Sequence, residues 1–369
     1  MRFTLKIVSV LFLSLLMLSF AQASNTYIVT FSEVDFGMTA ADYTNFSFAM
    51  TIDDLGNVIS GPKQLHNINW TPGPEITAIA QHNSSTINLW IQFGEGNVRH
   101  GFITSSTLAA SALTKLPLSF NDNTTNLQTT LTGKFLATVK SNFTAQAFGV
   151  TSEGAFTGKS WGLSPRTRRG NPFVGLSSDG LLAIGSAVAS NSVQLYAQSL
   201  NPVTNLPSGT PKLIANKVSA ISPDVTNVLS GNQRFVIYRD QQVGLTMVTT
   251  HGLWQTPSWA LNSQRSAAPT LIPPEGRILL EQIDATTNAP LSPAKTLLAD
   301  GFANMNVYDT LAIDPTGHFY VYGLFNGTGC DDLFFQALDA TGSPSGSAKK
   351  LLTCNDFDGG FYGLDILKQ

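Results

Sequence analysis

The sequence predicts an all-β fold built from repeated units of four short strands, and three observations support this prediction. The segment Pro172–Ile214 contains four short apolar or alternating runs separated by turn residues, a pattern typical of a β-meander. Related hairpin sequences recur along the chain, and they recur at similar spacing. A single four-stranded meander cannot bury both of its faces, so we expect each unit to pack against further copies of itself.

Four strands are expected within this segment: Phe173–Leu176, Leu181–Val188, Val193–Ala197 and Pro211–Ile214. Ser177–Gly180 separates the first two, and Pro207–Gly209 precedes the last. Clusters of Gly, Pro, Ser and Asp mark turns between strands. No helix is needed to account for the segment.

Three hairpin sequences can be aligned with one another: Leu195–Ile214, Leu279–Leu298 and Leu333–Leu352. Each has an apolar strand that ends in glutamine, then a turn led by Asn or Asp, a patch of Pro, Ser and Gly, and a Lys before paired apolar residues. The glutamines are Gln198, Gln282 and Gln336. Two weaker copies are Phe48–Leu65 and Ala147–Leu163. Five related hairpins indicate internal repetition.

The spacing of the repeats favours a β-propeller. The expected fourth strands end near Leu65, Leu116, Leu163, Ile214, Leu261, Leu298 and Leu352. The steps between these positions are 51, 47, 51, 47, 37 and 54 residues, around the period of propeller blades. Blades that pack face to face around an axis leave few exposed sheet edges.

The two ends of the propeller are expected to share one blade. Thr26–Val34, Asn45–Ile52 and Pro62–Leu65 have the pattern of second, third and fourth strands, and no inner strand precedes them. Phe361–Leu367 has the pattern of an inner strand with no hairpin after it. We therefore predict that this C-terminal strand joins the N-terminal blade and closes the ring.

Seven blades are preferred. The expected later blades are Glu75–Leu116, Leu127–Leu163, Pro172–Ile214, Val218–Leu261, Arg265–Leu298 and Asn306–Leu352. Arg265–Leu298 is short for four strands, and six blades are the alternative if it belongs to its neighbour. Ser105–Leu116 is the one passage with a helix as an alternative interpretation.

The N-terminal 23 residues have the features of a secretory signal peptide. Arg2 and Lys6 give a positive start, Ile7–Phe20 is apolar, and Ala21–Ala23 is an A-x-A cleavage sequence. A membrane anchor is the alternative, but the apolar run is short for a membrane span. The sequence therefore predicts removal of residues 1–23 and a single propeller domain, residues 24–369, in the periplasm or outside the cell.

Charge is sparse in this chain and argues against nucleic acid as a partner. Charged residues make up 12% of the sequence, and loss of the signal peptide leaves 19 basic residues against 24 acidic ones. Nucleic-acid binding depends on many Lys and Arg contacts with phosphate. We expect a monomer that binds a protein or a glycan, with no membrane span after the signal peptide is removed.

The two cysteines, Cys330 and Cys354, are predicted to form a disulfide. Both lie in the exported part of the chain, and an even count in an oxidising compartment favours pairing. In the predicted topology one lies in the loop between the second and third strands of a blade and the other in the link to the next blade. Both segments belong to the same face, and closing this loop would contribute about 3 to 4 kcal/mol.

The repeats resemble a known family. SSDGLLAIGS with VQLYAQSLN, and DPTGHFYVYG with DDLFFQALDATG, are similar to the TolB-like and WD-repeat-like propeller repeats of bacteria. In that family a Ser-Pro-Asp-Gly type of turn precedes a strand, and a Leu-Tyr pair precedes an Asp-x-x-x-Gly turn. These motifs specify turns and packing, so the resemblance implies the propeller fold and no particular activity or partner.

The sequence holds no recognisable catalytic motif. A G-x-S-x-G elbow, an H-E-x-x-H pair, a C-x-x-C pair and a phosphate-binding glycine loop are all absent. The five histidines, His66, His82, His100, His251 and His318, are scattered singly, and we interpret each as a surface or loop residue. Trp90 and Trp254 are interpreted as packing between blades. No catalytic residue and no cofactor other than calcium is predicted.

Calcium is one of two interpretations of the loop at residues 355–360. Asp356 and Asp358 alternate on a glycine-rich loop, and Ca²⁺ takes six to eight oxygen ligands. Asp331 and Asp332 would lie nearby through the predicted disulfide. The other interpretation is an Asx turn that leads into the closing strand.

A ligand-binding face is predicted from four further residues. Arg166, Arg168 and Arg169 form the only basic cluster, and Trp70 lies in another link between blades on the same predicted face. Arginine forks and exposed tryptophan recognise carboxylates, sugars and protein anchors; a solvated loop is the alternative interpretation. The sequence thus predicts a binding or interaction module, and the alternative function is a carbohydrate-active lyase or hydrolase with its site in the central funnel.

Overall fold

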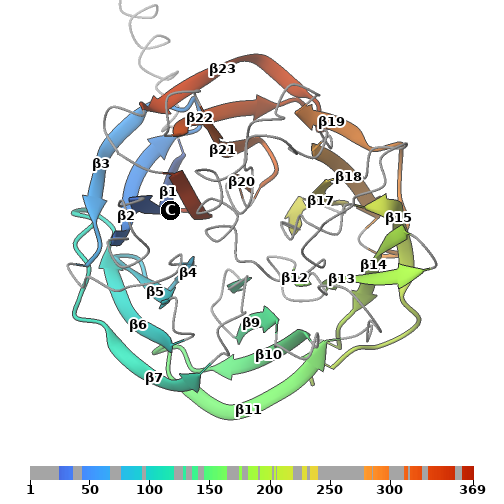
Figure 1. Cartoon of the computed structure of the whole chain (residues 1–369), viewed down its shortest axis with the longest axis horizontal. Helices are drawn as coiled ribbons and strands as arrows, with labels where there is room; N and C mark the ends of the chain where they lie inside the picture. The colour runs from blue at the N-terminus through green and yellow to red at the C-terminus, as the bar shows by residue number, and fades with distance from the viewer. Residues whose placement is uncertain are drawn as a thin grey trace, which may run out of the picture.

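Figure 1 shows a computed structural model of the chain. The structure describes residues 25–35, 44–66, 76–93, 97–119, 128–129, 135–139, 145–163, 174–176, 182–189, 192–201, 203–204, 206–218, 227–230, 233–239, 278–284, 286–298, 311–314, 316–325, 331–353 and 360–369. These residues form four-stranded antiparallel sheets arranged around a common centre. The part of the chain so described contains no helix long and apolar enough to cross a membrane.

Six sheets, numbered here in chain order, make up the described structure. The first has the order β24 (Gly360–Lys368), β1 (Thr26–Asp35), β2 (Thr44–Asp53), β3 (Val58–Gln64). The second contains β4 (Ile76–Gln81), β5 (Thr86–Gln92), β6 (Asn97–Thr104) and β7 (Thr114–Ser119). The third contains β8 (Gln128–Thr129), β9 (Phe135–Val139), β10 (Ala145–Val150) and β11 (Phe156–Leu163).

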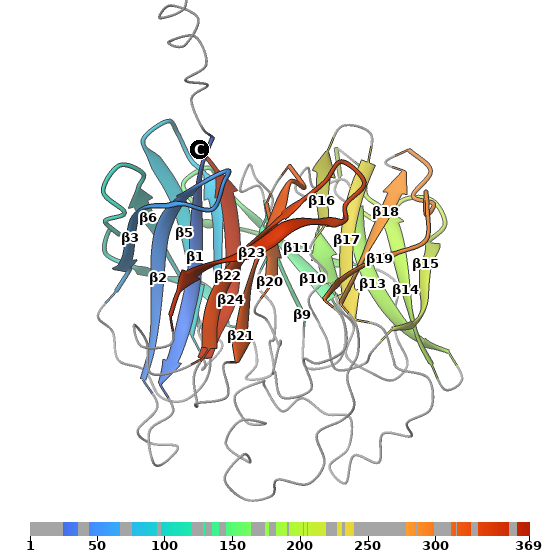
Figure 2. The same ribbon diagram turned by 90° about the horizontal axis from the view of Figure 1, so that it is seen from above.

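The remaining three sheets follow the same consecutive order. The fourth contains β12 (Val174–Leu176), β13 (Leu182–Ala189), β14 (Ser192–Ser199) and β15 (Lys212–Val218). The fifth contains β16 (Asn227–Ser230), β17 (Gln233–Arg239), β18 (Ile278–Asp284) and β19 (Lys295–Leu298). The sixth contains β20 (Leu311–Ile313), β21 (Phe319–Phe325), β22 (Asp331–Leu338) and β23 (Pro344–Leu352). Figure 2 shows that the strands run from one face of the ring of sheets to the other.

The C-terminal strand lies in the first sheet, as the sequence predicts for Phe361–Leu367. β24 pairs antiparallel with β1, with Val29 opposite Ile366. The amide of Gln369 donates to the carbonyl of Thr26 at 2.9 Å, which extends the pairing to the last residue. Among the described strands, β24 and β1 are the only sheet neighbours that are not consecutive in chain order.

The strands expected for the fifth and sixth units share one sheet. β17 pairs with β18 over their whole lengths, with Val236 opposite Glu281. Within the described strands, this is the arrangement of the six-unit alternative and not of the preferred seven. The sequence-based count assigns the apolar runs between β17 and β18, including Leu245–Thr249 and Leu261, to two units; these residues lie outside the described ones.

Neighbouring sheets pack through apolar faces. Between the first and sixth sheets, the ring of Tyr27 meets Phe319 edge-on at 4.8 Å, and Phe319 lies 4.7 Å from Phe335. Between the second and third sheets, fully buried Trp90 packs with Phe148 and Val150. The predicted packing role of Trp90 is therefore confirmed; Trp254 lies outside the described residues.

The Asn- or Asp-led turns of the repeats are Asx turns. In each, one side-chain oxygen accepts hydrogen bonds from two backbone amides of its own turn; these residues are Asp53, Asn201, Asp284 and Asp339. Such side chains reproduce a backbone turn. In the second sheet Ser105–Leu116 forms a turn and the start of β7 instead of a helix.

Two of the three aligned glutamines have the same structural role. The amide nitrogens of Gln198 and Gln336 each donate to three backbone carbonyls of their own hairpin, including those of Ser208 and Ser345. Gln282 differs because it lies two residues before its turn leader Asp284, whereas Gln198 and Gln336 lie three residues before theirs. Side chains alternate along a strand, so this offset turns Gln282 toward the other face.

A comparison of two glutamine variants tests this offset. We expect Gln336→Ala to lower the free energy of unfolding by about 1 kcal/mol more than Gln282→Ala, because Gln336→Ala loses the hydrogen bonds to the carbonyls of Ala337, Ser345 and Gly346. Both changes remove the same atoms from a buried position, and the amide nitrogen of Gln282 has no hydrogen-bond partner among the described residues. Chemical denaturation measures the difference, and equal losses would contradict the assignment.

Candidate functional site

The residues predicted for ligand binding, for calcium and for the disulfide lie outside the described residues. They are Trp70, Arg166, Arg168, Arg169, Asp356, Asp358, Cys330 and Cys354. The strands that precede their segments are β3, β11, β21 and β23. Second and fourth strands of a meander run in the same direction, so these four strands all end on one face of the ring. The assignments themselves remain predictions.

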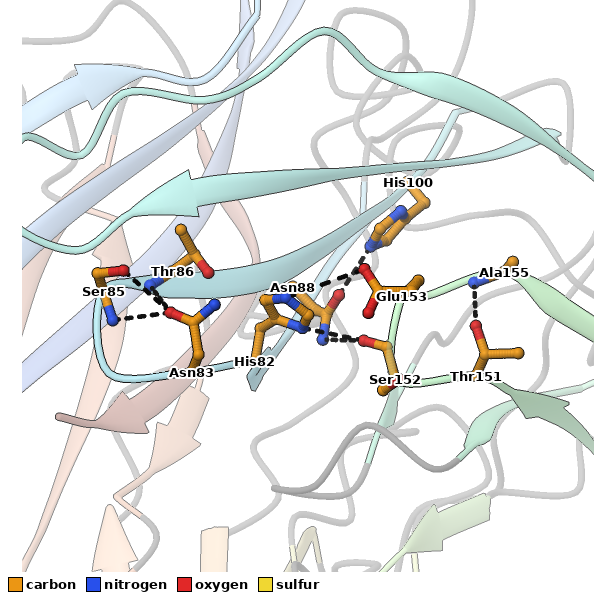
Figure 3. Close-up of polar contacts among 10 residues, drawn as sticks. All are labelled: His82, Asn83, Ser85, Thr86, Asn88, His100, Thr151, Ser152, Glu153 and Ala155. Atoms are coloured by element: carbon orange, nitrogen blue, oxygen red, sulfur yellow. Dashed lines mark hydrogen bonds and ion pairs between the residues drawn. The ribbon is translucent and has the colours of Figure 1, made fainter.

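A group of polar contacts joins the second and third sheets, and Figure 3 shows it in detail. On the second sheet, Trp90 lies opposite His100 and Asn88 lies opposite Phe102. Directly opposite residues, and residues two apart in a strand, share a face. All four side chains therefore face the third sheet.

The third sheet contributes the tight turn Thr151–Ala155, which connects β10 and β11. The amide of Gly154 donates to the carbonyl of Thr151 at 2.9 Å, and the hydroxyl of Thr151 accepts from the amide of Ala155 at 3.2 Å. Gly154 has φ of +73°, a left-handed conformation that glycine adopts without steric cost. This conformation directs the carbonyls of Ser152 and Gly154 toward the second sheet.

Three side chains of the second sheet donate to these two carbonyls. His82 Nδ1 lies 3.0 Å from the Ser152 carbonyl, and Asn88 Nδ2 lies 3.3 Å from the same oxygen. Trp90 Nε1 donates to the carbonyl of Gly154 at 3.2 Å. The arrangement holds the turn of one sheet on the face of the next, and we call these residues the turn-docking cluster.

His100 is the buried centre of the turn-docking cluster. Its Nε2 lies 2.9 Å from Asn88 Oδ1, and its ring packs against Phe102 at 4.8 Å. Burial lowers the pKa of His100 from 6.5 to about 4, with a further contribution from the nearby His82. His100 is therefore neutral at physiological pH and fixes the amide of Asn88 in the orientation that reaches Ser152.

His82 and Glu153 form the solvent-facing edge of the cluster. His82 Nε2 lies 4.0 Å from a carboxylate oxygen of Glu153, whose side chain is 70% exposed. Exposed pairs of this kind contribute little to stability. The buried members of the cluster are engaged in holding the turn, so the arrangement as a whole acts as a joint between sheets. Only this edge of the cluster is open to a ligand.

Sequence reasoning missed this cluster because it treats His82 and His100 as isolated residues. Both rings contact Phe102, at 4.9 Å and 4.8 Å. The signal that could have placed His100 is the hairpin register of β5 and β6, which sets it opposite Trp90. No local pattern could have revealed the turn of the third sheet as the common partner.

A second group of side chains lies at the opposite end of the second sheet. The ring of Phe93, which follows β5, has His66 at 5.5 Å on one side and the Arg99 guanidinium at 5.3 Å from its centroid. Phe93 is buried, whereas His66 and Arg99 are partly exposed. Cations over aromatic faces are attracted to the ring. This group, the Phe93 stack, lies where the link after β3 and the loop after β5 begin.

The described residues contain no group of three or more His, Cys, Asp or Glu side chains positioned to hold a metal ion. The predicted calcium ligands Asp356 and Asp358 fall outside that part of the chain. Asp332, expected near them, is described in β22, where its carboxylate pairs with Lys350 Nζ at 2.6 Å.

Comparisons with known proteins bear on the fold. No protein-family model matches the chain, and no curated protein matches it. Among solved structures, TolB from Acinetobacter baumannii matches with a TM-score of 0.51 and 14% identity, over 92% of this chain and 66% of that chain. A chain of a nidogen/laminin complex matches with a TM-score of 0.51 and 8% identity, over 92% of this chain and 98% of that chain. At these identities the likeness shows the fold alone, and the chain has the TolB-like propeller fold that its repeats predict.

Proposed function

We propose that this protein is a secreted or periplasmic binding module: a six-bladed propeller, closed by β24, that meets a protein or glycan ligand on the face where β3, β5 and β11 end. The Phe93 stack carries this proposal because it places a partly exposed arginine and a partly exposed histidine at that face, both packed on the buried Phe93 ring. Arginine and aromatic groups are the ones that dominate ligand recognition. The predicted residues Trp70, Arg166, Arg168 and Arg169 would extend the same surface.

The opposite face supports the proposal by contrast. Its turns use their polar side chains internally, in the Asx turns and in the turn-docking cluster. Hydrogen bonds already made within the protein leave those groups less able to bind a partner. The export of the protein, the single domain at residues 24–369 and the Cys330–Cys354 disulfide belong to the same proposal.

A binding screen of residues 24–369 against glycans and peptidoglycan fragments, with and without calcium, tests the function. The expected result is binding of at least one class of ligand by the folded monomer. A chelator that lowers the melting temperature would support calcium at Asp356 and Asp358, and an unchanged melting temperature would count against it. Failure of all glycan classes would direct the search to protein ligands.

The arginine cluster provides a sharper test once a ligand is identified. We expect the triple change Arg166→Ala, Arg168→Ala, Arg169→Ala to raise Kd at least about tenfold, which corresponds to about 1.4 kcal/mol. The control is the triple change of Lys115, Lys159 and Lys212 to alanine, which removes the same charge from exposed positions within β7, β11 and β15. Equal Kd values in both variants would exclude the arginine cluster from the binding face.

A carbohydrate-active enzyme is the second candidate, and one carboxyl group favours it. Asp365 lies on the innermost strand β24, and burial raises its pKa to about 7. A carboxyl group that holds its proton near neutral pH has the protonation state of a general acid, and Asp365 would have to release its bonds with Ile79 and Ile366 to reach a glycan. Mass spectrometry of any glycan that binds would show cleavage products if this candidate is correct, and their loss in Asp365→Asn would assign the acid.

A further inference from the structure

The closing strand carries one carboxyl group that reaches across to the next sheet. Asp365 lies opposite Thr30 in the pairing of β24 with β1. One carboxyl oxygen accepts the amide of Ile79 on β4 at 2.9 Å, and the other accepts the amide of Ile366 at 2.9 Å. The Ile79 bond joins the first sheet to the second at the inner edge of β4. β24 and β4 also make extensive contact with each other.

The surroundings of Asp365 are apolar or neutral. We call the contact between β24 and β4 the closing seam. Ile28, Ile79 and Leu367 belong to the hydrophobic cluster that fills it. A further polar contact in the seam is a hydrogen bond between the hydroxyls of Thr77 and Thr30 at 3.0 Å, and both residues are buried. Asp365 is partly exposed, and a carboxylate in such an environment loses part of its hydration without gaining a counter-charge.

No charged group faces Asp365 from the described elements packed against β24. β4 and β20 contain no titratable side chain. Tyr27 of β1 packs toward the sixth sheet, and Glu33 lies an odd number of residues from Thr30 and so on the other face of the strand. The titratable groups of β21 and β22 belong to the sixth sheet, on the far side of β24. Lys368 lies three residues after Asp365 in β24. Because side chains alternate along a strand, it faces away from Asp365's side of the sheet.

Two opposing effects determine the charge state of Asp365. Burial disfavours the carboxylate, and the two backbone hydrogen bonds favour it. Burial is the larger effect, and it raises the pKa of Asp365 to about 7. The group therefore changes its charge close to neutral pH, unlike an exposed aspartate, which ionises near pH 4.

We propose that Asp365 makes the closing seam pH-sensitive, so that its protonated form holds β24 against β4 more firmly than its ionised form does. Below the pKa of the folded state, a neutral carboxyl group fits the apolar seam and keeps an oxygen for the Ile79 amide. Above it, a charge is held between the two sheets with only part of its side chain exposed. The ring is consequently tighter in acidic surroundings than in alkaline ones, a property suited to an exported protein exposed to ambient pH.

The sign of the effect follows from proton linkage. Between the unfolded pKa near 4 and the folded pKa of about 7, the folded state binds one more proton at this group than the unfolded state does. The stabilisation of the folded state by the protonated Asp365 is complete below the unfolded pKa and is lost as pH rises through the folded pKa. In that window, the contribution of Asp365 increases the unfolding equilibrium constant about tenfold per pH unit.

Hydrogen exchange tests the proposal. Wild type is expected to show faster exchange in peptides covering residues 360–369 and 76–81 at pH 8 than at pH 5.5, after correction for intrinsic exchange rates. In Asp365→Asn, a neutral isostere, this excess should disappear, whereas the control Asp54→Asn, which removes a charge from a turn of the same sheet, should retain it. The same excess in Asp365→Asn as in wild type would overturn the proposal.

A measurement on wild type alone covers the case in which Asp365→Asn does not fold. Aspartate labelled with ¹³C at the carboxyl carbon is expected to give one resonance in the native protein that titrates near pH 7. Titration of every aspartate resonance below about pH 5, the range of ordinary carboxyl groups, would equally overturn the proposal.

Discussion

Gly154→Ala is expected to lower the free energy of unfolding by about 3 kcal/mol. A Cβ at this position would lie 2.1 Å from Nε2 of the buried His100 ring, and the ring is fixed by Asn88 and Phe102. Overpacking a core costs about 1 to 3 kcal/mol, and a left-handed φ costs a non-glycine residue about 1 to 2 kcal/mol more. The turn should also lose its bonds with His82, Asn88 and Trp90.

Gly158→Ala is the matched control for this prediction. Gly158 lies in the same hairpin with φ of +78°, and no described atom lies within 4 Å of the position that an alanine Cβ would take. It therefore carries the backbone cost alone, about 1 kcal/mol. Urea denaturation of both variants separates the two contributions. Equal losses of stability in the two variants would show that a clash with His100 adds nothing to the cost of Gly154→Ala.

A loss of stability of about 3 kcal/mol is expected from His100 as pH falls from 6.5 to 4. The folded pKa of about 4 lies below the ordinary value of 6.5, so the unfolded state binds the proton first. His100 contributes its full stabilisation of the folded state above pH 6.5. Below that pH the unfolded state binds one more proton than the folded state, so the stabilisation decreases until the folded state is protonated as well. Protonation would bury a charge beside Trp90 and Phe102.

His100→Gln tests this contribution, because glutamine is neutral over the whole range and can still donate to Asn88 Oδ1. The free energy of unfolding of the variant should lack the increase between pH 4 and 6.5 that His100 contributes in wild type. Asp365 has the opposite sign in this window, so wild type should show a shallow profile in which the two partly offset each other. Removing His100 should therefore make stability decrease as pH rises, and an unchanged profile would contradict the burial of a neutral imidazole.

Local patterns are sufficient to predict most strands of the described structure. The sequence predicts the first strands at Thr26–Val34 and Asn45–Ile52, and they are found at Thr26–Asp35 and Thr44–Asp53. Alternation of apolar side chains and Asx turns are properties of a few adjacent residues, so they can be read from sequence. The pairing of Phe361–Leu367 with β1 follows from counting strands, since one inner strand is missing at one end and one is left over at the other.

Features that depend on distant residues cannot be predicted in the same way. The preferred count of seven units differs from the described sheets because β17 and β18 are sheet neighbours although residues 240–277 separate them. Gln282 resembles Gln336 in sequence, but its distance from the turn leader differs by one residue, which changes the face that it occupies. Asp365 has no distinguishing neighbours in sequence, and its pKa is set by burial against β4, a strand from the other end of the chain.

The position of β24 also determines the order in which the protein can mature. Residues 360–368 leave the ribosome after every other described strand, yet they provide the innermost strand beside the first one made. Until then β1 has a free inner edge, and unpaired strand edges can pair with other chains. The nascent chain thus stays vulnerable to misassociation until its synthesis is complete, and a molecule cut short before residue 360 would keep that exposed edge permanently.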